Sequence, residues 1–155
     1  MPEIIVPSGH KSLNWVFPLF YSMDYGDAPD VKERCEKIVS ALDMNHVDLS
    51  RVAFMRSKGT STRNTIARCH GLSRVMQIGM NTKAFYVIEV ITEIFDKLDH
   101  EEQTKVLIHE LMHIPRNFGG GFRHHDYVCR KEVDRMYKIF KERTNSPIGS
   151  KWFSF

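Results

Sequence analysis

The sequence predicts an α+β domain, and three patterns support this class. Two stretches with helical spacing of apolar residues follow capping-box signatures, one beginning at Asp30 and the other at Asp99. Between them, short runs rich in Val, Ile, Phe and Met are separated by Gly and Asn, as is typical of strands. The chain has 155 residues, 42% of them hydrophobic, and is therefore long enough to bury a core without disulfides.

The first helix is predicted from about Asp30 to Asp43. Glu33 follows Asp30 at the capping-box spacing, and one face of this helix carries Val31, Cys35, Ile38 and Leu42. Residues 1–28 contain several Pro and Gly residues, which break regular structure, so we expect an irregular N-terminal arm there.

The middle of the chain is predicted to form a small, mostly antiparallel sheet. Four strands are expected, and the third and fourth lie close enough in the sequence to form a hairpin: Arg51–Arg56, Asn64–His70, Val75–Met80 and Phe85–Ile91.

Two more helices are predicted in the C-terminal half. The capping box at Asp99 and Glu102 opens a helix that continues through Val106–Ile114 and stops at Pro115. After the loop Gly119–Gly121, a last helix is expected from about Asp126 to Arg143, with one face formed by Cys129, Val133, Met136 and Phe140. One domain therefore spans residues 29–143, and the tail 144–155, which carries three aromatic residues, is expected to dock onto it.

The segment His109-Glu110-Leu111-Met112-His113 has the HExxH pattern. Residues four apart lie on one face of a helix, so His109 and His113 can both point at one metal ion. Glu110 projects about 100° around the axis and can act as a base beside the metal. The surrounding residues are apolar on nearly every side, which predicts burial of the helix, and buried ionisable groups need a metal or close partners.

A catalytic zinc site needs a third protein ligand, and His124 and His125 are the candidates. If the last helix begins near these residues, its phase turns His125 inward and His124 outward. Asp126 also lies near the inward face and is an alternative ligand, or an acceptor that orients a histidine ring.

The HExxH segment extended to Pro115, the run Phe118–His125, and Tyr86–Val90 before Phe95–Leu98 resemble a small metallopeptidase family of phages and archaea. That family is related to the SprT-like zincins. The similarity covers about Ala28 to Glu142. It implies a compact zincin-like domain with an N-terminal helix, a small sheet, an HExxH helix and a C-terminal helix. In that family the third ligand is the histidine of a short Arg-x-His segment, which here ends at His125; His124 departs from the family pattern and leaves the choice open.

The predicted function is zinc-dependent hydrolysis of peptide bonds. Zn²⁺ held by His109, His113 and His125 would activate water, with Glu110 as general base. Arg123 and Tyr127 are candidate donors to the developing oxyanion, or surface residues. The strand Phe85–Ile91 resembles the edge strand that aligns an extended polypeptide substrate in zincins.

Charge suggests an alternative function. Residues 49–88 contain seven basic and no acidic side chains, so this segment could contact nucleic acid around a structural metal, although a solvated basic surface is the favoured explanation. A latent zincin, its cleft filled by the arm or the tail, is a further alternative.

The remaining expectations concern location. No apolar run approaches the roughly 18 residues of a membrane span, and no secretory signal is expected, so no membrane association is predicted. Three scattered cysteines argue for a reducing, cytoplasmic location.

Overall fold

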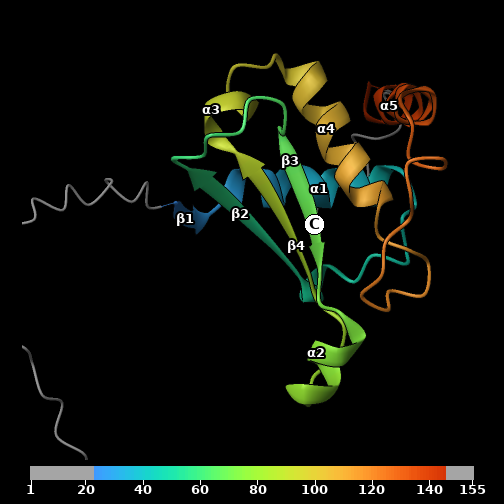
Figure 1. The fold of residues 1–155 in the computed structure, drawn as a ribbon. Helices are drawn as coiled ribbons and strands as arrows, with labels where there is room; N and C mark the ends of the chain where they lie inside the picture. Colours follow the sequence, from blue (N-terminus) through green and yellow to red (C-terminus); the bar gives the residue numbers. More distant parts are fainter. Residues whose placement is uncertain (1–22, 146–155) are drawn as a thin grey trace, which may run out of the picture.

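The computed structural model describes residues 23–145 and confirms the α+β class (Figure 1). The elements in chain order are β1 (Asp24–Asp27), α1 (Pro29–Ala41), the 3₁₀ turn η1 (Leu49–Arg51), β2 (Val52–Lys58), β3 (Ala67–Gly71), α2 (Arg74–Gly79), β4 (Tyr86–Ile91), α3 (Thr92–Phe95), α4 (His100–Met112) and α5 (Arg130–Asn145). β1 lies within the range assigned to the N-terminal arm. Residues 1–22 of the arm and the predicted docking of the tail lie outside the described residues.

The four strands form one mixed sheet in the order β1-β2-β4-β3. β1 pairs with β2 and β3 with β4 in antiparallel fashion, whereas β2 and β4 are parallel. β4 therefore lies in the middle of the sheet, and β3 is an edge strand. The prediction that Phe85–Ile91 contains the edge strand was wrong, because the intervening residues bring Ala67–Gly71 to that position.

The predicted strand Val75–Met80 and its hairpin were also wrong. These residues form the short helix α2, which projects beyond the sheet (Figure 1). Apolar residues misled the prediction because they are solvent-exposed here: Val75 is 74% and Ile78 is 67% exposed. The residue that faces inward is Gln77, whose side-chain amide donates to the carbonyl groups of Leu72 and Gly119.

The first predicted helix exists, but its capping box does not form. α1 begins at Pro29, which suits the first helical turn because its missing N–H would be unpaired there. Asp30 instead binds Arg56 of β2 at 2.6 Å and so ties α1 to the sheet. At α4 the predicted cap forms, since the Asp99 side chain accepts a hydrogen bond from Glu102 N–H.

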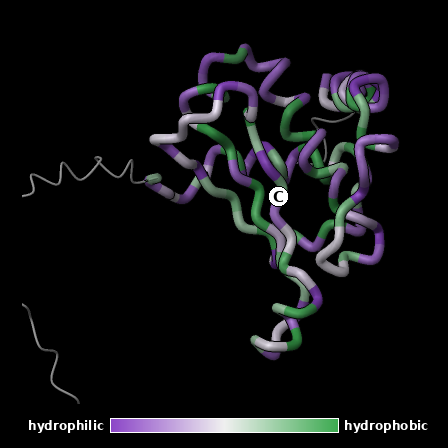
Figure 2. The backbone as a smooth tube through the Cα atoms, in the orientation of Figure 1, coloured by the Kyte–Doolittle hydropathy of each residue, from purple (hydrophilic) through white to green (hydrophobic). Residues whose placement is uncertain are grey.

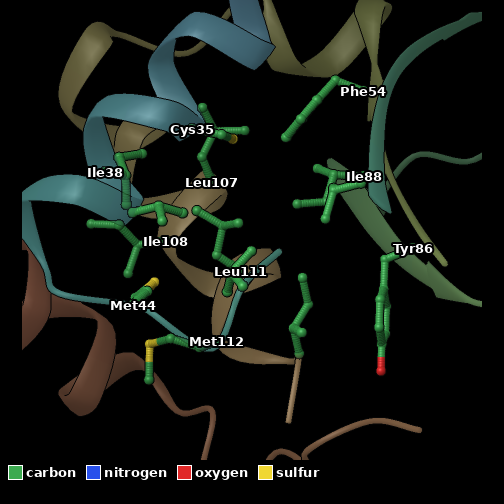
Figure 3. Packing of buried hydrophobic residues seen from close by; sticks show 14 of the residues in the cluster. Cys35, Ile38, Met44, Phe54, Tyr86, Ile88, Leu107, Ile108, Leu111 and Met112 are labelled. Carbon is green, nitrogen blue, oxygen red and sulfur yellow. The ribbon is translucent and has the colours of Figure 1, made fainter. Parts of the chain in front are cut away.

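The core lies between the sheet and the helices α1 and α4. Side chains of Phe54 and Ile88 from the sheet point toward Cys35 of α1 and toward Leu107 and Leu111 of α4 (Figure 3). Hydrophobic residues follow the central strands, whereas α5 is mostly hydrophilic (Figure 2). One face of α5, including Val133, Met136 and Phe140, packs on this core as predicted. None of the helices within residues 23–145 is both long and apolar enough to cross a membrane.

Candidate metal centre

Three histidines converge beside α4. His109 and His113 lie on one face of the helix, and the loop before α5 brings His125 to them. One ligand nitrogen of each ring lies within 4.8 Å of the others. His109 Nε2 and His113 Nε2 are 3.1 Å apart, near the roughly 3.3 Å expected between two nitrogens bound to one tetrahedral zinc ion. This donor set fits a metal that prefers imidazole nitrogen.

The ring of His113 is oriented by the backbone. Its Nδ1–H donates to the carbonyl of Arg123 at 2.7 Å, and the N–H of Arg123 donates to the carbonyl of His113 at 2.8 Å. This contact leaves the Nε2 lone pair of His113 directed toward the other rings. Such a hydrogen bond fixes the tautomer that a metal ligand requires.

The surroundings keep the rings of α4 neutral. Burial, together with repulsion from His113 and His125, lowers the pKa of His109 to about 4. Burial also lowers the pKa of His113. Neutral imidazoles repel one another less and can bind a cation near pH 7.

Glu110 lies beside this cluster and is 7% exposed. Burial raises the pKa of its carboxyl to about 7, and the nearby backbone of Cys69 in β3 offsets only part of that effect. The side chains whose ligand atoms converge are the three histidines, and Glu110 is not one of them. A carboxyl group with a pKa near neutrality can both accept and release a proton.

The edge strand β3 has free backbone groups facing this site. Ile91 N–H donates to Ile66 carbonyl and Leu72 N–H to Phe85 carbonyl, which fixes the alternation of the antiparallel ladder. Residues 68 and 70 therefore pair with β4, while Ala67, Cys69 and Gly71 direct their N–H and C=O groups to the open edge.

Two adjoining cavities follow β3 past the histidines. One, of about 640 Å³, is lined by residues 64–67 together with His109, Glu110 and His125. The other, of about 450 Å³, is lined by residues 67–70, by the same three side chains and by His113. Together they form a cleft between the edge strand and the metal centre.

The glycine loop Gly119–Gly121, which leads to His125, is anchored to the sheet by hydrogen bonds. The hydroxyl of Tyr86 accepts from Gly120 N–H and donates to Gly121 carbonyl, both at 2.8 Å. Gly120 has φ +92°, and a Cβ on it would lie 2.1 Å from the carbonyl oxygen of Leu72. A glycine is therefore required here. The sequence did not identify Tyr86 and Gln77 as residues that hold the loop of the site. The run Gly119–Gly121 was the only sequence feature that indicated close packing of this loop.

The structure joins His125, rather than His124, to the histidine cluster, but the reason given from the sequence was wrong. α5 begins at Arg130, so neither residue lies on it. His125 lies in a turn in which the carbonyl of His124 accepts from the N–H groups of Tyr127 and Val128. The side chain is directed by this turn and the glycine loop, not by helical phase.

The other candidate residues lie around the cluster. Within residues 23–145, Asp126 is exposed and makes no hydrogen bond to a histidine ring. The guanidinium of Arg123 stacks on the ring of Tyr127 at 3.9 Å, and Tyr127 lines neither cavity of the cleft. The backbone of Arg123 thus has a clear role, whereas an oxyanion role for either side chain stays a prediction.

The basic segment 49–88 is partly neutralised by the fold. Arg51 binds Asp48, and Arg56 binds both Asp30 and Asp96, at distances of 2.6–2.8 Å. Arg68 lies 3.9 Å from Glu89. The absence of acidic residues within the segment therefore overstates its free positive charge.

The fold and the site together define an α+β protein with a three-histidine centre and a buried glutamate beside it. Comparison with protein families identifies the group: residues 23–141 match the family described as "putative phage metallopeptidase". The chain belongs to this family, as the sequence resemblance predicted. No curated protein and no solved structure matches the chain.

Proposed function

We propose that this protein is a zinc-dependent peptidase that hydrolyses peptide bonds in extended polypeptides. The observation that carries the proposal is the placement of Glu110 between the three histidines and the open edge of β3. A metal with only a structural role would not require a buried, unligated carboxylate facing a cleft.

His109, His113 and His125 would hold the metal. Zinc bound there would supply a Lewis acid that polarises the scissile carbonyl and lowers the pKa of water. Imidazole donors in tetrahedral geometry favour zinc over harder cations such as Mg²⁺.

Glu110 would act as general base and then general acid. Its carboxylate accepts a proton from the attacking water and gives it to the leaving amine. The burial of Glu110 excludes bulk water from the base.

The substrate would add to β3 as a further strand. Ala67, Cys69 and Gly71 direct their backbone N–H and C=O groups to the edge. This pairing would hold a polypeptide of any sequence in an extended form along the cleft.

The test compares wild type with Glu110→Gln on an unfolded polypeptide, with bound zinc measured in both proteins. Gln keeps the size of Glu but accepts no proton at neutral pH, so hydrolysis should fall by about 10²–10⁴-fold while zinc remains at one ion per chain. A variant as active as wild type would overturn the proposal. A wild type that holds zinc but cleaves nothing, including after removal of the arm or the tail, would favour the structural-metal alternative.

The relation to SprT-like zincins, the cytoplasmic location and nucleic-acid binding by segment 49–88 stay predictions. Cys35, Cys69 and Cys129 are unpaired, which is compatible with a reducing compartment.

A further inference from the structure

A third cavity, of about 490 Å³, lies where the residues after α1 meet the loop that follows α4. Part of its wall is apolar: Met44 and Met112 line it and lie next to each other at the edge of the core (Figure 3). Its polar lining consists mainly of Arg116, Arg123, His46 and Tyr127. Arg123 also lines the cleft at the metal centre.

The charge in this cavity is not balanced. Within residues 23–145, neither Arg116 nor Arg123 forms a salt bridge or donates a side-chain hydrogen bond. The carboxylate that lines the cavity, Asp43, is already bound by Arg143 at 2.6 Å. Two guanidinium groups thus face one space with no anion assigned to them.

His46 shows that the two guanidinium groups act on the same space. Burial lowers the pKa of His46, and both Arg123 and Arg116 lower it further. Its Nε2 contacts the carbonyl of Ile114 at 3.2 Å, which fixes the ring at the cavity wall.

The side chain of Arg123 is held ready for a ligand. Its backbone exchanges two hydrogen bonds with His113, and its guanidinium lies over the ring of Tyr127, 3.9 Å from the ring centre. A stacked guanidinium keeps its in-plane N–H groups free, and these match the two oxygens of a carboxylate or a phosphate. Little conformational entropy is then lost when an anion binds.

We propose that this cavity is a binding site for an oxyanion, a carboxylate or a phosphate, held between Arg116 and Arg123. The site adjoins the three-histidine centre, because Arg123 lines both spaces, but it uses the two arginines and not the histidines and does not depend on peptidase activity. A cation would be repelled by the same groups.

The experiment is an NMR titration of the zinc-loaded and the chelator-treated protein with inorganic phosphate. Saturable shifts are expected at Arg116, Arg123 and His46 in both forms. Arg116→Ala should weaken binding by about tenfold or more, since charge-assisted hydrogen bonds are lost. Arg116→Lys should weaken it less, because the charge remains but the paired donors do not. Arg116 is exposed, so its replacement leaves the core intact.

Arg63→Ala is the matched control, because Arg63 is also exposed and lies outside the cavity. It should leave binding unchanged. A second arm titrates a short acetylated peptide with a free C-terminal carboxylate and the same peptide as its amide. Binding of the acid but not the amide assigns the site to a peptide terminus, and binding of phosphate alone assigns it to a phosphate ligand. The proposal is overturned by a lack of saturation, by binding only in the zinc-loaded form, or by equal losses in Arg63→Ala and Arg116→Ala.

Discussion

Two regions of this protein supply the histidines of the metal centre, and they hold them by different means. His109 of α4 and His113, which directly follows that helix, are brought to one side by helical geometry, and many other residues of the helix lie in the core. In the loop before α5, His125 is placed by contacts with distant elements, through Tyr86, Gln77 and the backbone of Gly120. The helix would keep its two ligands in almost any fold that buries it, whereas the loop keeps its ligand only in this one.

The sharpest test of this difference is His125→Ala against His124→Ala. His125 supplies one of three converging nitrogens, so its loss should weaken zinc binding roughly 1,000-fold, given the about 10–16 kcal/mol that a full set of ligands provides. His124→Ala should change zinc affinity little. Competition with a chelator measures both. Equal losses would show that the loop can exchange one histidine for the other.

The second test concerns Glu110 in metal-free protein. Its pKa rises from 4.5 in the unfolded chain to about 7 in the folded protein, so the folded state holds more protons between these pH values. The contribution of Glu110 to stability is therefore present below pH 4.5 and is lost as the pH rises through 7. The side chain of Glu110→Gln does not titrate. Between pH 4 and pH 8, the free energy of unfolding of wild type should therefore fall by about 3 kcal/mol relative to that of Glu110→Gln.

Urea unfolding at both pH values measures this change. Glu142→Gln, at an exposed position of α5, is the control and should show no such pH dependence. A stability difference for Glu110→Gln that is the same at pH 4 and pH 8 would mean that the carboxyl is less buried than the structure shows.

The third test is Gly120→Ala in the loop. The positive φ and the contact with the Leu72 carbonyl should cost about 2 kcal/mol or more of stability and should weaken zinc binding through displacement of His125. Gly121→Ala is the matched control, since a Cβ there meets no atom within 4 Å. Thermal unfolding and zinc titration of both variants decide the point. If Gly121→Ala is as damaging, the loop is sensitive to any substitution and Gly120 has no special role.

The sequence was sufficient for the features that depend on local geometry. The cap at Asp99 follows from the capping-box spacing, and the apolar face of α1 and the shared face of His109 and His113 follow from the helical period. The structure has each of them. The short runs rich in Val, Ile, Phe and Met likewise located β2 and β4.

The errors fall where contacts between distant residues overrule local pattern. Val75–Met80 resembles a strand, but its apolar side chains have no sheet neighbour to cover them, and Gln77 anchors the segment as a helix. Asp30 has a capping-box partner three residues on, yet the ion pair with Arg56 takes its carboxylate. A single sequence does not show such competition, because both outcomes satisfy the local rules.

What the sequence by itself determined is therefore the chemistry: an HExxH helix with two histidines on one face and a glutamate beside them. The tertiary structure decided which strand forms the edge of the cleft and how the third histidine reaches the metal centre. The physical reason is the range of the forces involved. Helical periodicity is set within four residues, whereas strand order and the path of the glycine loop depend on hydrogen bonds between residues such as Tyr86 and Gly120, which are 34 positions apart in the chain.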